Sequence, residues 1–133
     1  MKKNNGFTLI EILVVTSIIV LLTSTAVVTY SVFLRQSRDA RRKSDLGQIS
    51  VALEMYRSNE DTYPTTALSE LTAPTVYIQT VPTDPKNPTY TYYYSATASD
   101  YTLGAYLEGG GTTCVAGQCG GNCNYCLGPY GQK

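Results

Sequence analysis

The 133-residue sequence contains no histidine and no tryptophan. Histidine is the side chain most often used as a general base and as a metal ligand near neutral pH, so the sequence lacks the commonest catalytic base and the commonest metal ligand. Proline is absent before Pro64, and acidic residues are absent from Gly109 to Lys133. Without proline, the first half of the chain can form one uninterrupted helix. Without acidic residues, the last segment lacks the carboxylate oxygens that calcium sites use.

Charged residues are few and unevenly placed, although the formal net charge is zero. Residues 1–43 hold seven Lys and Arg against two acids, a net charge of +5, and residues 44–133 hold three against eight, a net charge of −5. The acidic C-terminal part argues against nucleic-acid binding by bulk charge. No nucleophile with a base, phosphate-binding loop or cleft-forming carboxylate pair occurs, so the sequence does not predict an enzyme.

One long apolar block dominates the chain. Phe7–Leu34 spans 28 residues, Glu11 is its only charged residue, and Lys2 and Lys3 precede it. About 20 helical residues cross a hydrocarbon core of about 30 Å, so the block can span a membrane with a turn or two to spare. A carboxylate in such a helix costs a few kcal/mol, so we expect Glu11 to have a pairing partner or a function.

The hexapeptide Gly6-Phe7-Thr8-Leu9-Ile10-Glu11 resembles the class III signal of type IV pilins and type II secretion pseudopilins. The resemblance implies that a prepilin peptidase cuts between Gly6 and Phe7 on the cytoplasmic side and methylates the new terminus. It also implies that Glu11 assembles the filament by pairing with the Phe7 ammonium of a neighbouring subunit, because a buried acid needs a counter-charge. Most members of this family carry a proline where this chain has Val28, so local melting of the helix there is not implied.

The helix is expected to continue beyond the apolar block, from Thr8 to about Ser58. Beyond Leu34 the apolar residues recur three or four apart, which predicts one buried stripe of an amphipathic helix; they are Leu46, Ile49, Leu53 and Tyr56. Gly47 weakens this helix by about 1 kcal/mol relative to alanine. The basic cluster from Arg35 to Lys43 is interpreted as a solvated face that touches lipid phosphates. The alternative is a charge partner for the acidic heads of neighbouring subunits.

The next segment is expected to form a small head. Prolines at 74, 82, 85 and 88 predict turns, and Tyr90–Ser95 and Tyr101–Glu108 predict two strands joined as a hairpin. Tyr101, Leu103, Ala105 and Leu107 alternate onto one face, which should cover the helix stripe. Tyr63-Pro64 and Val81-Pro82-Thr83-Asp84-Pro85 are similar to the heads of pseudopilins and related pilins. The expected fold class is therefore α+β, a pilin-like fold with a long helix on a small antiparallel sheet.

All four cysteines lie near the end of the sequence, at Cys114, Cys119, Cys123 and Cys126. Two disulfides with open connectivity are the favoured interpretation, because an exported, Gly-rich loop has too few apolar residues to pack by itself. A zinc site of four thiolates is the alternative, since Cys123-x-x-Cys126 has a usual half-site spacing. No other cofactor or metal is expected.

The expected organisation has five parts along the chain. They are a leader (residues 1–6), a transmembrane or filament-core helix (7–34), its amphipathic continuation (35–59), a head with a β-hairpin (60–108) and a Cys- and Gly-rich loop (109–133). We interpret the chain as a type IV pilus subunit. Its precursor would lie in the cytoplasmic membrane with the head outside, in contact with lipid and an assembly platform, before it joins copies of itself in an extracellular or periplasm-spanning filament. A pseudopilin of a secretion or DNA-uptake system, and an anchored binding domain that does not polymerise, are the alternatives.

Overall fold

The computed structural model describes residues 6–111, 114 and 123–133. The chain divides into two compact units, Met1–Arg35 and Gln36–Lys133. One helix, α1 (Leu9–Glu60), runs through both units. It matches the predicted helix closely and continues without interruption past Val28, where the sequence has no proline.

The C-terminal end of α1 is closed by a residue in the left-handed region. Asp61 has φ 57° and donates its backbone N–H to the carbonyl of Arg57 at 2.9 Å. Glycine or asparagine usually adopts this geometry at the end of a helix, and aspartate is among the few other residues that adopt it readily. The helix therefore ends two residues later than predicted, and it ends before Pro64 is reached.

In the first unit, those side chains of the apolar part of α1 that the structure describes are exposed. By length and composition α1 can cross a membrane, although no membrane accompanies the structure. Hydroxyl groups within this part of α1 bond back to carbonyls about one turn earlier: Thr23 donates to the Ile19 carbonyl at 2.9 Å, Ser24 to Leu21 at 2.8 Å and Thr25 to Leu22 at 2.9 Å. These polar groups are satisfied within the helix, as a lipid environment requires.

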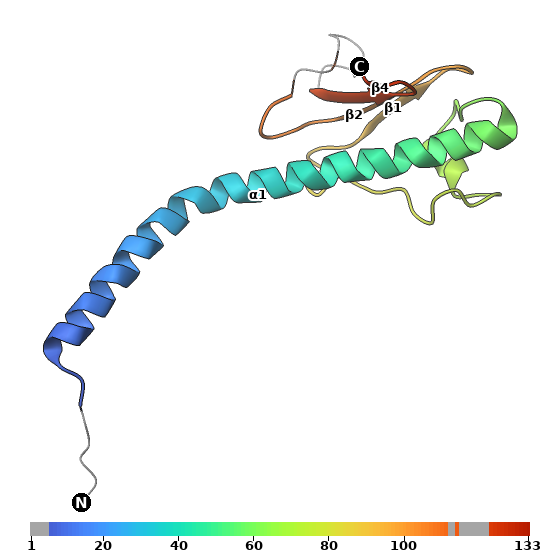
Figure 1. Ribbon diagram of the computed structural model, residues 1–133. Coiled ribbons are helices and arrows are strands. Elements are labelled where there is room, and N and C mark those ends of the chain that lie inside the picture. The colour runs from blue at the N-terminus through green and yellow to red at the C-terminus, as the bar shows by residue number, and fades with distance from the viewer. Residues whose placement is uncertain (1–5, 112–113, 115–122) are drawn as a thin grey trace, which may run out of the picture. The chain divides into compact units, whose positions relative to one another are not determined.

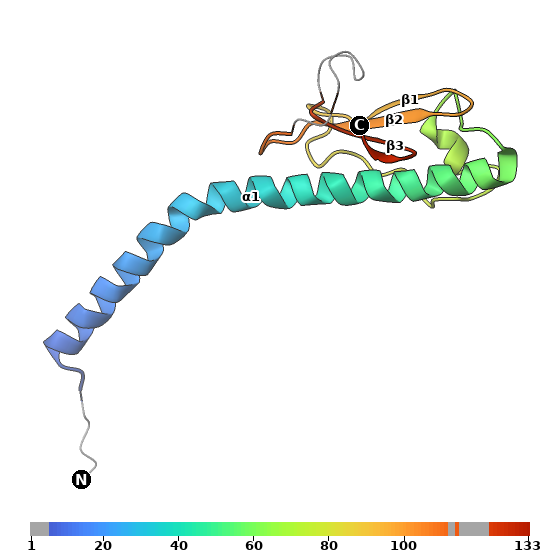
Figure 2. The same cartoon turned by 45° about the horizontal axis from the view of Figure 1, so that its top comes forward.

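In the second unit, the described residues contain four strands and a short 3-10 helix, η1 (Leu68–Leu71). The strands form one antiparallel sheet in sequence order: β1 (Tyr93–Ala96), β2 (Tyr101–Ala105), β3 (Tyr125–Gly128) and β4 (Gly131–Gln132). Figures 1 and 2 show this sheet lying along the C-terminal half of α1. The predicted α+β class, a long helix packed against a small antiparallel sheet, is confirmed.

The core of the second unit lies between α1 and the sheet. The predicted stripe supplies Leu46, Ile49 and Leu53, each with no exposed surface, while Tyr56 packs at the edge. From β2 and the residues after it, Tyr101, Leu103, Ala105 and Leu107 are buried on the helix side, as their alternation predicted. Burying apolar side chains from both elements is what stabilises a sheet too small to stand alone.

The segment after Gly109 contains two strands, so the prediction that it is a loop is wrong. β3 pairs with β2 in the register Leu103↔Leu127 and Ala105↔Tyr125, and β4 pairs with β3. The β2–β3 pairs join residues 20 to 24 positions apart in the sequence, so the Gly-rich local composition did not reveal them. The two predicted strands are also shorter than expected, since β1 begins at Tyr93 and β2 ends at Ala105.

Candidate functional site

The residues around the expected cleavage point form a capping box at the start of α1. Phe7 is 84% exposed and precedes Thr8, which caps the helix. The Glu11 carboxylate accepts the Thr8 backbone N–H and the Thr8 hydroxyl on the same oxygen, Oε2, each at 2.8 Å. In return the Glu11 N–H donates to Thr8 Oγ1 at 3.3 Å. Threonine at the cap and glutamate three positions later is the usual sequence signature of this arrangement, and the sequence analysis overlooked it.

This geometry changes the problem that Glu11 poses. The sequence predicts a partner for its carboxylate in a neighbouring subunit, and Thr8 supplies two hydrogen bonds to it within the same chain. Both bonds use Oε2, and among the described residues nothing bonds to Oε1. The carboxylate can therefore keep its cap on the helix while Oε1 accepts a further donor.

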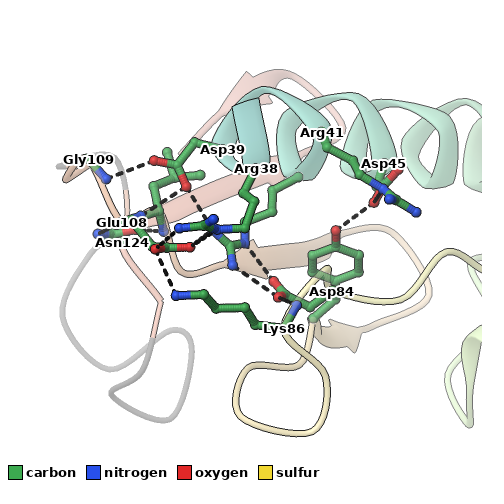
Figure 3. A network of polar contacts seen from close by, with 12 residues as sticks. Arg38, Asp39, Arg41, Asp45, Asp84, Lys86, Glu108, Gly109 and Asn124 are labelled. Carbon is green, nitrogen blue, oxygen red and sulfur yellow. Dashed lines mark hydrogen bonds and ion pairs between the residues drawn. The ribbon is translucent and has the colours of Figure 1, made fainter. Parts of the chain in front are cut away.

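A second cluster surrounds Arg42, whose side chain is fully buried. Figure 3 labels its carboxylate partners, Asp39, Asp84 and Glu108. Its guanidinium donates to both carboxylate oxygens of Asp84, through Nε at 2.7 Å and Nη2 at 3.0 Å. Its Nη1 donates to Asp39 at 2.8 Å and to Glu108 at 3.0 Å. Arg42 thereby connects α1, the turn that contains Asp84 and the segment after β2. Bidentate, charge-assisted bonds of this kind are the strong ones in proteins.

Further bonds extend the cluster around Glu108. Arg38 donates to both Glu108 oxygens at 2.7 Å, and Lys86 Nζ lies 2.9 Å from Oε2. Asp39 accepts the backbone N–H groups of Glu108 and Gly109 at 2.9 and 2.7 Å. The bonds from Arg38 are the main reason why the pKa of Glu108 lies well below its usual range. The Asp84 carboxylate raises the pKa of Arg42, so the guanidinium stays charged although it is buried.

The structure corrects the interpretation of the basic cluster from Arg35 to Lys43. Arg38 and Arg42 point into the head and pair with acids of the same chain, so they are available neither to lipid phosphates nor to neighbouring subunits. Arg41 stays 68% exposed and fits the predicted solvated face. The sequence contains a signal for the burial of Arg42 with its partner Asp39. They lie four and seven positions before Leu46 and so extend the apolar stripe.

The cysteines confirm the predicted disulfide in part of the tail. Cys114 and Cys126 are joined, with their Cα atoms 5.1 Å apart, and Cys123 is also disulfide-bonded. The sulfur atoms of these three residues lie within 4.8 Å of one another. Cys119 lies outside the described residues. A sulfur atom committed to a disulfide does not serve as a thiolate ligand, so the oxidised cluster does not fit the alternative of a four-thiolate zinc site.

Comparison with known proteins identifies both parts of the chain. Residues 1–27 match the family model of the prokaryotic N-terminal methylation motif, and residues 32–116 match that of type II secretion system protein G. The chain is 32% identical over 127 residues to the type II secretion system core protein G of Vibrio cholerae serotype O1, covering 84% of this chain and 87% of that protein. No solved structure matches the chain.

A further similarity is shorter. The chain is 43% identical over 54 residues to a probable minor fimbrial protein of Dichelobacter nodosus, which is 41% of this chain and 34% of that protein. The chain thus spans about a third of the fimbrial protein and most of the secretion protein. With a methylation motif at the start, a capped apolar helix and a matching head, the chain belongs to the protein G family of type II secretion systems, within the wider class of type IV pilins and pseudopilins.

Proposed function

We propose that the chain is a structural subunit of a filament that is cut between Gly6 and Phe7 and assembles through its apolar helix. The supporting observation is the capping box beside the cut site. Glu11 is held by Thr8 through Oε2 alone, one turn from Phe7. After cleavage each copy would carry a cationic amine at Phe7, and the Glu11 Oε1 of a neighbour offers an acceptor for it. A charge inside a dry helix bundle is costly to leave without a partner, so the Glu11–Phe7 pair would fix the axial register between subunits.

Of the possible filaments, we favour the pseudopilus of a type II secretion system. Similarity to protein G extends over the head as well as the helix, and it covers most of both chains. A type IV pilus subunit is the second candidate, supported by the shorter similarity to a fimbrial protein. In both cases the precursor would sit in the cytoplasmic membrane with its head outside. Its partners would be the prepilin peptidase, an assembly platform, lipid and copies of itself, and the role requires neither a catalytic group nor a cofactor.

The experiment replaces the chromosomal gene by variants of the full chain and records three properties of each strain. Mass spectrometry of the mature N terminus reads the cut, cell fractionation reads membrane insertion, and export of a secreted protein is compared with surface fibres in sheared preparations. For Glu11→Ala we expect normal insertion and cleavage but at least a tenfold loss of filament-dependent export. Glu60→Ala removes an exposed carboxylate from the other end of α1 and serves as the matched control.

The outcomes separate the alternatives. Loss of export without loss of surface fibres selects the pseudopilin, and loss of fibres with normal export selects the pilus subunit. A mature protein that still begins at Met1, or wild-type assembly by Glu11→Ala, contradicts the proposed function. An intact Met1 would favour an anchored domain that does not polymerise.

A further inference from the structure

Gly47 lies inside α1, and no contact among the described residues explains a glycine there. It is not at a positive φ, and a Cβ added to it would meet nothing within 4 Å. Glycine weakens a helix interior compared with alanine, so a residue with this cost and no contact calls for an explanation. An atom from outside the described part of this chain, lying closer to the backbone than a side chain would allow, would explain it.

An apolar groove opens at the same place. It is lined by Ser44, Gly47, Gln48 and Val51 of α1 and by Tyr77 and Ile78 of the loop after η1. Its lining carries no charged side chain, and three apolar side chains in and beside it are more than half exposed: Val51 at 58%, Met55 at 53% and Val76 at 63%. The groove is therefore suited to an apolar rod and not to an ion or a charged ligand.

The loop wall of this groove is held in place. The backbone N–H groups of Tyr77 and Ile78 both donate to the Leu71 carbonyl, at 2.9 and 3.2 Å. Asn59 donates to the Tyr77 hydroxyl at 3.1 Å, and the Tyr77 ring packs on Tyr56 with centroids 5.4 Å apart. A wall that is already ordered loses little freedom when a partner docks.

The chain itself offers an apolar rod of the right kind. About 20 helical residues counted from Leu9 are enough to cross a hydrocarbon core, so Tyr30 and Phe33 come after the part that lipid covers. Both side chains are about two-thirds exposed, at 64% and 66%, and Val27 is 75% exposed. Residues three apart share one helix face, so Tyr30 and Phe33 extend the face of Val27 beyond the lipid and make an apolar patch that needs cover.

We propose that the groove around Gly47 receives the Tyr30–Phe33 segment of a second copy of this chain. The proposal deepens the proposed function and rests on it. Glycine lets the two helices approach more closely than other residues allow. The groove and the segment are different surfaces, so the contact does not close on itself and repeats from copy to copy as an open polymer. For parallel helices the step between copies is about 21 Å along the axis, since 14 residues separate Phe33 from Gly47.

Cross-linking of the full chain in intact cells tests the contact, because copies in a growing filament can take the axial step of about 21 Å that copies side by side in the bilayer cannot. One tagged copy carries Phe33→Cys and a second, differently tagged copy carries Gln48→Cys; a short bis-maleimide then joins thiols that lie close together. We expect the cross-linked dimer to exceed by at least tenfold the dimer formed when Thr89→Cys, an exposed position outside the groove, replaces Gln48→Cys. Equal yields for the two pairs would overturn the proposal and would leave Phe33 at the lipid surface instead.

Gly47→Leu supplies the second test. A Cβ at this position meets no described atom within 4 Å, and leucine is a better helix former than glycine, so the head should melt at the wild-type temperature or above it. In the second copy it would fill the groove, and we expect at least a tenfold loss of the Phe33–Gln48 cross-link and of filament-dependent export, with a smaller loss for Gly47→Ala. A wild-type cross-link in Gly47→Leu contradicts the groove. Normal export by Gly47→Leu together with failed export by Glu11→Ala would reject this groove alone, whereas a groove cross-link with both normal export and normal surface fibres in Glu11→Ala would reject the proposed function alone.

Discussion

At the scale of single residues, Arg42 is the side chain on which most of the head's polar contacts converge. Its burial with three carboxylates means that removing the guanidinium leaves acids in the interior without a counter-charge. For Arg42→Met we expect a loss of about 3–5 kcal/mol in the free energy of unfolding, measured by denaturant titration. Arg41→Met, which removes a largely exposed arginine one position earlier, should stay within about 0.5 kcal/mol. Equal effects of the two substitutions would contradict this account of the cluster.

Glu108 makes the same cluster sensitive to acid. Because hydrogen bonds from Arg38 hold its pKa below the usual value in the folded head, the unfolded chain takes up this proton at a higher pH than the folded chain. The stabilisation is therefore complete above the ordinary glutamate pKa of about 4.3 and is lost as the pH falls below it. Melting temperatures measured from pH 7 to pH 3 should fall more steeply for the wild type than for Glu108→Gln. Parallel curves would show that another carboxylate carries the acid dependence.

The contrast between Glu11 and Arg42 shows how far the sequence could predict single residues. An acid in an apolar block is conspicuous, so Glu11 was recognised, although its capping partner Thr8 was overlooked. Arg42 was missed because it lies in a run of basic residues whose ordinary position is the solvent. Its partners Asp84 and Glu108 are 42 and 66 positions away, and no local pattern connects them. Only the phase of the helix stripe distinguishes Arg42 from Arg41.

At the scale of elements, α1 has one buried face in the head, and its two faces should respond differently to truncation. Leu53 is fully buried against the sheet, whereas Val51 is 58% exposed. Leu53→Ala is expected to lower the free energy of unfolding by about 2–5 kcal/mol, because it removes packed methyl groups and leaves a cavity. Val51→Ala in the same helix should change it by less than about 1 kcal/mol. The measurement is denaturant unfolding of both variants, and similar losses would place the wrong face of α1 against the sheet.

The disulfide makes a separate prediction for β3. Cys126 lies within that strand and is tied to Cys114, 12 positions earlier, which shortens the loop that the unfolded chain must close. In the chain-entropy view such a bridge contributes about 3 kcal/mol. Cys114→Ser should therefore lower the melting temperature of the head and speed up amide exchange in β3 before β2. Uniform exchange across the sheet would contradict a local effect.

The elements differed in how well the sequence predicted them. The helix was predicted almost completely, because its periodicity extends over many turns and no proline interrupts it. β2 was predicted from strict alternation. β3 and β4 were not, since their pairing depends on β2 as a template and on a covalent bond at Cys126 rather than on any strand pattern in the Gly-rich tail.

At the scale of the whole molecule, the division into two units predicts that the second unit folds without the first. Gln36–Lys133 contains the complete core, the Arg42 cluster and the disulfide. A chain that begins at Gln36 should remain monomeric in solution and unfold in one cooperative transition, as small single domains usually do. Size-exclusion chromatography and circular dichroism check this. A broad, non-cooperative transition would show that the head needs the preceding helix.

The three acids that bind Arg42 come from α1, from a proline-rich turn and from the segment following β2. This distribution affects how the second unit responds to proteases. None of these segments can adopt its final position while another is missing, because the guanidinium would then face an incomplete set of charges. The second unit would thus be either fully folded or open to proteases, with few partly folded states in between.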